Sequence, residues 1–277
     1  MPELVSPQAD LVRTFVDGLV SGSPDKVRSV FSGPADIDDP FAGRHIDGGF
    51  EQMVRNWGPA KLARIKSTRL DHLTIGKGGQ FIGAEVSLNL DRNGEDKLVN
   101  AVIVMEMDGE KAVKSRLYYR RARIDGVQHV RNRILDDTLG LEPYMPALQR
   151  YQEALTAGDA HAQAETFSPD GRFDGHGEGT DLSKGLGMGV YEGRETIRDV
   201  LIQMFGIIDH DVGGSESGQH GANIEKMNGF TDGTTYVLEF NIIDPNHPTN
   251  RVHAGIACYE LGEGQLIKEA RVYDEAW

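Results

Sequence analysis

The sequence predicts an α+β fold that occurs twice along the chain. Three observations predict it. Each half begins with apolar residues at helical spacing, each half ends with long extended segments, and short motifs recur in the same order in both halves. Helices followed by an antiparallel meander are typical of α+β domains. We therefore expect two tandem cone-shaped domains, each with helices packed on a strongly curved antiparallel sheet.

The helices of each half are predicted from periodicity and capping residues. Apolar side chains three or four positions apart mark the first helix of each half: Leu11, Phe15 and Leu19, and then Leu148, Tyr151 and Leu155. A glycine-containing turn follows, and Asp159 is placed to cap the second helix of the second half. A short strand is expected around residues 36–39 or 172–174, and a short helix after Gly48 or Gly193.

Three long strands close each predicted domain. Runs rich in β-branched and aromatic residues predict them. They cover residues 81–90, 98–107 and 113–123 in the first half, and residues 235–243, 251–261 and 266–273 in the second. The expected boundary lies at residues 130–143, so the first domain spans residues 1–132 and the second spans residues 140–277.

The spacing between matching residues supports a duplication. The matched pairs are Gly22 and Gly158, Phe31 and Phe167, Gly48 and Gly193, and Tyr119 and Tyr273. Their separations are 136, 136, 145 and 154 residues, so the offset grows only where loops would be inserted. Self-similarity in a fixed order is the signature of a repeated structural unit.

The composition disfavours several classes of function. Charged residues make up 26% of the chain, and its net charge of −14 disfavours nucleic-acid binding, which needs clustered Lys and Arg. The single cysteine, Cys258, excludes an intramolecular disulfide and metal sites built on several cysteines. The spacing of His210, Asp211 and His220 fits no standard metal site. We therefore expect no metal and no cofactor.

The expected partners follow from the same observations. The N-terminal residues lack the basic and apolar regions of an export signal, and no run reaches the roughly 18 apolar residues of a membrane span. We expect a cytoplasmic protein with a small-molecule substrate and with no nucleic-acid or membrane partner. Pairing of chains as a homo-oligomer through an open sheet face stays open.

The motifs of both halves resemble those of one known superfamily. The order is a helix, an AGD-type turn, a second helix, the motif FSPD, the motif EGRETI and three long strands. It resembles the nuclear transport factor 2-like superfamily, which includes SnoaL-like cyclases, ketosteroid isomerases, limonene epoxide hydrolases and scytalone dehydratases. The resemblance covers nearly the whole chain, twice. It implies two cones that each enclose a largely apolar small molecule, and it leaves the reaction open because this fold hosts unrelated chemistries.

Asp39 is the candidate general base of the first domain. The segment ADIDDPFAGRHIDGGFEQMV resembles the ketosteroid isomerase segment that carries the catalytic aspartate, and the resemblance places that aspartate at Asp39. The other isomerase positions differ, because Phe15 stands where the tyrosine donor is expected and Ile103 where the acid donor is expected. Steroid isomerisation is therefore not expected in the first domain.

The second domain departs from the isomerase pattern at other positions. Tyr151 occupies the position of the isomerase tyrosine. Asp174 is adjacent to the position of the catalytic aspartate, and Ala257 stands where the acid donor would be. The resemblance therefore makes Tyr151 a candidate substrate contact and Asp174 a candidate catalytic carboxylate.

The last long strand of the first domain offers two candidate inward faces, because alternate side chains of a strand point to opposite sides. The superfamily's pocket positions imply Arg116, Tyr118 and Arg120 as catalytic donors, which would suit a substrate with phenolate, enolate or carboxylate character. Leu117 and Tyr119 form an equally consistent inward face. The positions that match the first set in the second domain are Ala270, Val272 and Asp274.

Two histidines are candidate acid–base residues of the second domain, because histidine titrates near neutral pH. His253 shares its strand parity with Ala257, and it is expected to point inward with Asn241 or Glu239 near it across the hairpin. His176 lies in a long Gly-rich stretch of the kind that often forms a substrate loop. The complete set of candidate substrate contacts is Phe15, Trp57, Tyr151, Met188 and Asn241.

The sequence favours a cofactor-free acid–base lyase that eliminates water from a bulky aromatic or polycyclic small molecule. Carbon–carbon cleavage, such as the deformylation of a lignin-derived diarylpropane by superfamily relatives, is one form of this reaction. The alternatives are an epoxide hydrolase or polyether cyclase, supported by Asp39 in its Asp-Pro segment, and a ketosteroid isomerase-like isomerase. A non-catalytic small-molecule-binding protein is the remaining alternative, supported by the replaced positions Phe15, Ile103 and Ala257.

Overall fold

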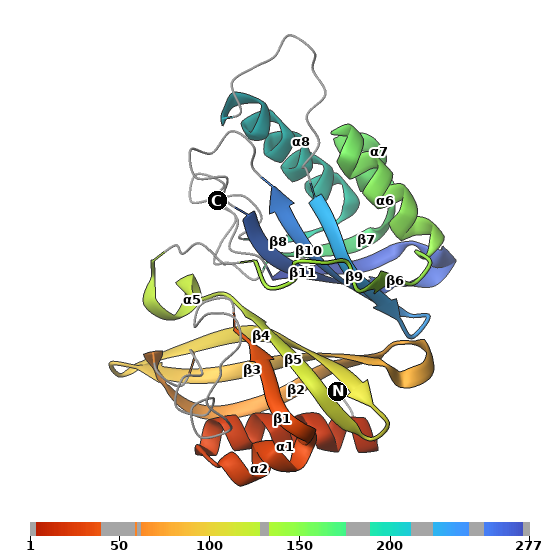
Figure 1. The fold of residues 1–277 in the computed structure, drawn as a ribbon. Coiled ribbons are helices and arrows are strands. Elements are labelled where there is room, and N and C mark those ends of the chain that lie inside the picture. Colours follow the sequence, from red (N-terminus) through yellow and green to blue (C-terminus); the bar gives the residue numbers. More distant parts are fainter. Residues whose placement is uncertain are drawn as a thin grey trace. The chain divides into compact units, whose positions relative to one another are not determined.

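The structure is a computed structural model with two compact units, Met1–Asp136 and Asp137–Trp277 (Figure 1). Each unit combines helices with one mostly antiparallel sheet, which confirms the predicted α+β class for both. The residues that it describes are 4–39, 59, 62–127, 133–175, 189–211, 224–243 and 252–273.

The first unit begins with two helices, α1 (Pro7–Ser21) and α2 (Pro24–Val30), which lead into a five-stranded sheet. The strands are β1 (Phe31–Asp38), β2 (Arg64–Ile75), β3 (Phe81–Arg92), β4 (Glu95–Asp108) and β5 (Lys111–Tyr119). Their order is β1-β5-β4-β3-β2, with β1 parallel to β5 and the other pairs antiparallel. A 3-10 turn (Lys77–Gly79) joins β2 to β3, and a short helix, α5 (Ala122–Asp125), follows β5. The strands β1 and β2 are therefore opposite edges of this sheet.

The second unit repeats this plan and adds a strand at each edge. Its helices are α6 (Pro146–Ala157), α7 (Ala160–Ala164) and α8 (Arg194–Asp211). Its strands are β6 (Gly140–Leu141), β7 (Phe167–Asp174), β8 (Val190–Glu192), β9 (Ile224–Thr231), β10 (Thr235–Ile243), β11 (Val252–Leu261) and β12 (Ile267–Tyr273). The order is β6-β9-β10-β11-β12-β7-β8, with β7 parallel to β12 and β6 parallel to β9. The strands β7, β12, β11, β10 and β9 thus repeat β1, β5, β4, β3 and β2.

The first helix of each unit ends at a matching glycine. Gly22 and Gly158 both adopt the left-handed conformation, with φ of 68° and 69°. A residue with a Cβ would be strained there, so glycine ends each helix at low cost. At the start of α1, the Ser6 hydroxyl accepts a hydrogen bond from the backbone N–H of Ala9. The predicted cap is also present, since the Asp159 carboxylate accepts the backbone N–H of Ala162.

The helices α1 and α2 cover one face of the first sheet, and α6, α7 and α8 cover one face of the second (Figure 1). An aromatic pair recurs at the centre of this contact. In the first unit the rings of Phe15 and Phe31 lie 5.9 Å apart, edge to face, and in the second unit those of Tyr151 and Phe167 do the same at 5.9 Å. The partners of the two pairs differ by the same 136 residues, so the duplication extends to side-chain packing.

The structure contains strands that the sequence did not predict. The two long strands among them are β2 in the first unit and β9 in the second. The predicted strand over residues 113–123 stops at Tyr119, because the chain turns there into α5. The helix after Gly193 is 18 residues long rather than short.

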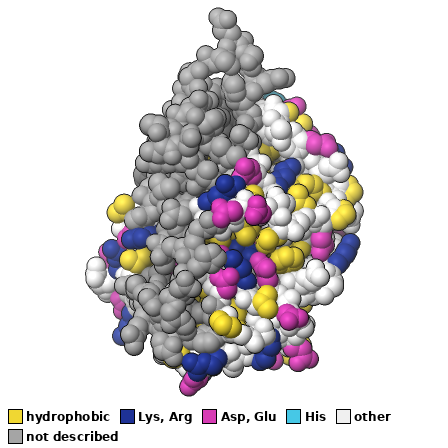
Figure 2. Space-filling model, viewed as in Figure 1, with side chains coloured by type: hydrophobic (Ala, Val, Ile, Leu, Met, Phe, Trp, Pro, Cys, Tyr) yellow, Lys and Arg dark blue, Asp and Glu magenta, His cyan; other side chains and the backbone are white. Residues whose placement is uncertain are grey.

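Two further properties concern the surface of the described residues. None of their helices is both long enough and apolar enough to cross a membrane. Figure 2 shows acidic and basic side chains interspersed, rather than gathered by sign, on the face that it presents. The net charge of −14 therefore does not form a single acidic surface there.

Candidate functional site

The candidate site of the first unit is built around Asp39, the residue that follows β1. Pairing with β5 fixes the local geometry, with Ile37 opposite Ser115 and Asp38 opposite Arg116. Ile37 belongs to the apolar core under the helices. Alternation along the chain then sends Asp38 to the other face and returns Asp39 to the core face.

Asp39 is fully buried, and the Tyr119 phenol is among its contacts. The Tyr119 hydroxyl lies 3.3 Å from Oδ1 and 3.3 Å from Oδ2 of Asp39, so its proton is shared between the two carboxylate oxygens. Tyr119 itself packs in the apolar core with Phe15 and Ile103. A carboxylate in such surroundings is shielded from water and depends on the hydrogen bonds it accepts.

The cationic wall expected in the first cone is not there. Leu117 and Tyr119 belong to the core cluster, which places Arg116, Tyr118 and Arg120 on the opposite face of β5. On that face the Arg116 guanidinium forms an ion pair with Glu106 of β4. The expectation that these three residues line the cone is therefore corrected, and Tyr119 takes their place.

A shift of one residue explains this correction. The prediction matched Tyr119 to Tyr273, whereas the strand pairing matches Arg116 to Arg271, because these arginines lie opposite Asp38 and Asp174 respectively. A slip of one residue transfers every side chain of a strand to the other face. In the second unit, the pocket positions that the superfamily implies do face inward, since Ala270 and Val272 pack against the core.

Asp174 corresponds to Asp38 rather than to Asp39. Its neighbour Phe173 packs in the core, so the Asp174 carboxylate points to the opposite face, where it accepts a hydrogen bond from Arg172 at 2.8 Å. The prediction of Asp174 as a carboxylate inside the second cone is therefore corrected. At the offset of 136 residues, Gly175 stands where the first unit has Asp39.

Two phenols and an amide lie together among the buried polar groups of the second unit. The rings of Tyr151 and Tyr259 are 5.2 Å apart, and the Gln152 amide lies 3.4 Å from the Tyr259 hydroxyl. Burial, reinforced by the neighbouring Tyr151, raises the pKa of Tyr259 well above its ordinary value. The Tyr259 hydroxyl therefore stays protonated over a wide pH range, so it offers a hydrogen bond rather than a base.

Asn241 lies away from this interior. Leu238 and Phe240 of β10 pack in the core, so Asn241 and Glu239 occupy the other face. There the Asn241 amide lies 3.4 Å from a carboxylate oxygen of Glu225. The expectation that Asn241 or Glu239 faces this interior beside His253 is therefore corrected, because alternation along β10 places both side chains on the opposite face of the sheet, where they are also buried.

The remaining candidates are placed in part. Phe15 and Tyr151 pack in the cores of their units, where the sequence expected them to contact a substrate. His253 lies on β11 opposite Ile242, and its side chain is outside the described part of the structure. His176, Trp57 and Met188 also lie outside the described residues.

The described residues contain no cluster of metal ligands. Their His, Cys, Asp and Glu side chains form no group of three or more that could hold an ion. Cys258 is buried on β11 and takes part in no disulfide.

Sequence reasoning missed Tyr259 and Gln152 as polar groups of the second interior, and it left Tyr119 open as an inward residue of the first. Tyr119 was present as one of two alternative faces, and the apolar character of Leu117 was the signal that favoured it. Tyr259 shares the parity of Ala257, which was already expected to point inward. Gln152 follows Tyr151 on α6 and carried no comparable signal.

Comparisons with known proteins give similarities at low identity. No family model and no curated protein matches the chain. One similar solved structure is a hypothetical protein with a ketosteroid isomerase-like fold from Catenulispora acidiphila, at 14% identity and a TM-score of 0.34, with 41% of this chain and 88% of that chain covered. Another is an NTF2-like protein of unknown function from Mesorhizobium loti, at 13% identity and a TM-score of 0.35, with 49% and 98% covered.

A third similar structure is an epoxide hydrolase/cyclase-like enzyme of pyran ring formation in the polyether salinomycin. It is 16% identical, with a TM-score of 0.32, and the match covers 46% of this chain and 87% of that chain. Within the present chain, each unit begins its main sheet with two helices, which lead into a strand that pairs in parallel with the last strand, and it ends in a meander of long strands. This topology confirms the α+β order of elements that the sequence predicted for both halves, with helices first and a meander of long strands last.

Proposed function

We propose that the first unit is a cofactor-free acid–base catalyst in which Asp39 removes a proton from carbon in a small, largely apolar substrate. The observation that carries the proposal is the buried Asp39 carboxylate, which accepts the Tyr119 hydroxyl within an apolar core. A desolvated carboxylate is a stronger base than one in water, because charge that water no longer stabilises is readily neutralised by a proton. Tyr119 is a positioning residue that holds this carboxylate.

Elimination is the reaction that we favour for this site. Asp39 takes the proton from the carbon beside a carbonyl group, and the C–H electron pair becomes part of a new carbon–carbon double bond. The neighbouring C–O bond breaks with its electron pair on oxygen, and the hydroxyl leaves with the proton as water. An isomerase would share the first step and return the proton to another carbon.

The second unit has a different proposed role. Its described interior presents Tyr151, Tyr259 and Gln152, which suit the binding of a polar group on an apolar molecule. His253 and His176 stay the predicted acid–base residues of this unit. Single substitution of each histidine would show whether the second unit contributes to turnover.

The chain offers a matched pair of variants for the test. Asp38 and Asp39 are neighbours on opposite faces of the sheet, and Asp38 pairs with Lys114 at 3.0 Å. The probe is an aromatic β-hydroxyketone that carries deuterium beside its carbonyl group. We expect Asp39→Asn to slow both deuterium loss and formation of the conjugated enone by about a hundredfold or more, as removal of a general base does. Asp38→Asn should keep the wild-type rate.

Two outcomes would contradict the proposal. Retained deuterium loss in Asp39→Asn would remove Asp39 as the base. Equal loss of rate in both variants would indicate a general effect on the fold. Turnover in water labelled with oxygen-18 separates the alternatives further, because a hydrolase places the label in the product and an elimination does not.

A further inference from the structure

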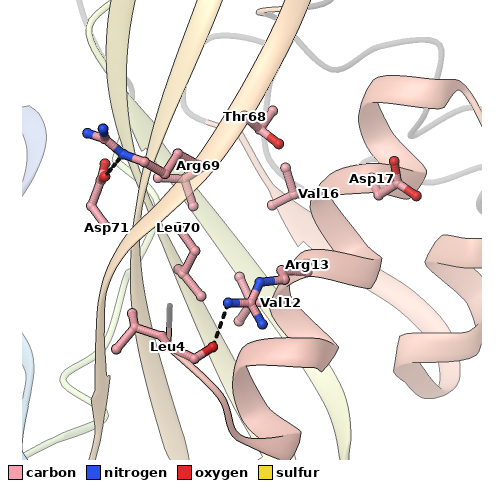
Figure 3. Close-up of a pocket in the computed structure, with 10 residues that line it drawn as sticks. Leu4, Val12, Arg13, Val16, Asp17, Thr68, Arg69, Leu70 and Asp71 are labelled. Atoms are coloured by element: carbon pink, nitrogen blue, oxygen red, sulfur yellow. Dashed lines mark hydrogen bonds and ion pairs between the residues drawn. The ribbon is translucent and has the colours of Figure 1, made fainter. Parts of the chain in front are cut away.

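A groove lies between α1 and the β2 edge of the sheet in the first unit, and its volume is about 480 Å³ (Figure 3). Small-molecule sites in proteins have volumes of about 300–1,000 Å³. The groove has apolar walls from the segment before α1, from α1 itself, and from β2 and β3. These walls are Leu4, Val12, Val16, Leu70 and Val86.

The groove is separate from the site around Asp39. Its walls come from β2, β3 and α1, whereas Asp39 follows β1 and Tyr119 ends β5. The strands β1 and β2 are the two opposite edges of the five-stranded sheet. A ligand in the groove therefore lies at the other edge of the sheet from the carboxylate.

One cation projects into this apolar groove. Figure 3 shows the Arg13 side chain beside Val12, with its guanidinium close to Leu4. Its Nη2 donates to the Leu4 carbonyl oxygen at 2.5 Å, and its Nη1 lies 3.0 Å from a carboxylate oxygen of Asp10. Asp10 is 71% exposed, and such surface ion pairs contribute at most about 1 kcal/mol. A ligand carboxylate can therefore compete with Asp10 for the Arg13 guanidinium.

The other charged groups of the lining are engaged elsewhere. Asp17 forms an ion pair with Lys26 of α2. Arg69 pairs with Asp71, and their charged ends lie on the side of β2 that faces away from α1 (Figure 3). Asp71 also accepts the Ser87 hydroxyl. Arg13 is thus the charge that a ligand in the groove would meet.

We propose that this groove binds a small amphiphile with an apolar body and a single carboxylate. The carboxylate lies against the Arg13 guanidinium, whose planar fork matches two carboxylate oxygens. The apolar body lies against Val12, Val16 and Leu70 and is withdrawn from water there. This site goes beyond the proposed reaction and does not depend on it.

Three ten-carbon probes test the charge preference on the full chain by titration calorimetry, each below its micellar concentration. They are decanoate, decanol and decylammonium. We expect decanoate to bind at least about tenfold more tightly than decylammonium, a difference of about 1.4 kcal/mol. Arg13→Gln should remove this preference and leave the affinity for decanol within about twofold, which is about 0.4 kcal/mol. Arg13→Lys, which keeps the positive charge, should retain part of the preference.

Two further variants locate the bound probe. Thr68 lines the groove from an exposed position of β2, so Thr68→Trp should fill the groove and abolish decanoate binding without disturbing the core. Methyl resonances of Val12, Val16 and Leu70 should shift on addition of decanoate to the wild type, which gives a readout that needs no variant. Asp39→Asn should leave decanoate binding unchanged, so this test is independent of the proposed reaction.

Several results would overturn the assignment. No binding of decanoate, or equal binding of all three probes, would remove the anionic amphiphile as the ligand. Shifts confined to methyl groups outside the groove would place the ligand elsewhere. Loss of decanoate binding in Asp39→Asn would place it in the cone instead.

Discussion

At the scale of single residues, the contact between Asp39 and Tyr119 joins two groups that lie 80 positions apart in the sequence. A carboxylate that leaves water loses several kcal/mol of hydration unless hydrogen-bond donors replace the lost water. The Tyr119 hydroxyl is such a donor, at 3.3 Å from both carboxylate oxygens. The fold therefore holds an acidic side chain inside an apolar core, and the phenol supplies it with a hydrogen-bond partner there.

A double-mutant cycle on Asp39 and Tyr119 measures this contact. Tyr119→Phe takes a donor from a buried carboxylate, and we expect the free energy of unfolding to fall by about 1–3 kcal/mol. In the Asp39→Asn background the same change should cost less, with a coupling energy of about 0.5–3 kcal/mol. Urea denaturation of the four proteins gives the values. As a control, Tyr118→Phe lies on the other face of β5, and its effect on the free energy of unfolding should add to that of Asp39→Asn. If the effects of Tyr119→Phe and Asp39→Asn were also additive, Asp39 and Tyr119 would not interact.

The sequence identified one member of this pair and left the other open. Asp39 was found from its Asp-Pro segment, and the strand pairing places it on the core face. Tyr119 and Tyr118 are adjacent, and a single step of register decides which of them faces inward. Register depends on the bulge where β5 pairs with β4 between Glu106 and Met107, which is a feature of the folded sheet. Local sequence carries too little information to fix it.

At the scale of elements, the edges of the second sheet are covered by short strands. The strand β6 pairs in parallel with β9, and the backbone N–H of Glu142 donates to the Gly229 carbonyl at 2.8 Å. The Tyr236 hydroxyl donates to the Glu142 carbonyl at 2.6 Å and so ties β6 to the next strand, β10. An uncovered β9 would present a row of free backbone groups to other chains. These hydrogen bonds therefore protect the sheet as well as stabilise it.

Tyr236 and Tyr144 provide a matched test of this attachment. Their rings pack at 5.0 Å, but the Tyr144 hydroxyl has no hydrogen-bond partner among the described residues. We expect Tyr236→Phe to lower the free energy of unfolding by about 1 kcal/mol, because it leaves the Glu142 carbonyl without this donor. Tyr144→Phe should leave stability unchanged or raise it, since it removes a buried polar atom that is unsatisfied. Equal effects of the two changes, measured by thermal unfolding, would count against the attachment.

The long central strands were predicted from the sequence, whereas the long strands β2 and β9 were not. The central strand β10 was predicted over the bounds that it has, because its sequence TYVLEFNII is rich in the β-branched and aromatic residues that strands favour, and side chains on both of its faces are buried. The edge strand β2 has the sequence RIKSTRLDHLTI and exposes many of its side chains. Edge strands need little apolar alternation, so their sequences resemble loops. The first residues of β9 are polar because they also form an edge of the sheet, since β6 pairs only with the later residues Asn228 and Gly229.

At the scale of the whole molecule, one framework carries two different interiors. The helix–strand aromatic pair is the same in both units, and the strand order is repeated. The acidic position Asp39 has become Gly175 in the second unit, whose described interior takes its polar groups from Tyr259 and Gln152 instead. The duplication thus preserved packing and changed chemistry, which favours divided roles for the two units.

The buried phenols give the second unit a characteristic response to high pH. Burial raises the pKa of Tyr144 to about 12 and raises those of Tyr236 and Tyr259 further, from an ordinary value of 10.0. A group whose pKa is higher in the folded state contributes its full stability below its unfolded pKa and loses it as the pH rises towards the folded value. We therefore expect the free energy of unfolding of this unit to fall between pH 10 and 12.

Ultraviolet absorbance of tyrosinate and circular dichroism, followed together across this range, test the expectation. Because the three phenols ionise only when the unit opens, their absorbance change should coincide with the loss of secondary structure. Tyr144→Phe removes one of the three groups, so it should make the decline with pH shallower, whereas Tyr236→Phe should also lower stability at neutral pH through the lost bond to Glu142. Ionisation of all the tyrosines near pH 10 with the fold intact would show that these phenols are open to water, and the interior assigned to the second unit would then be wrong.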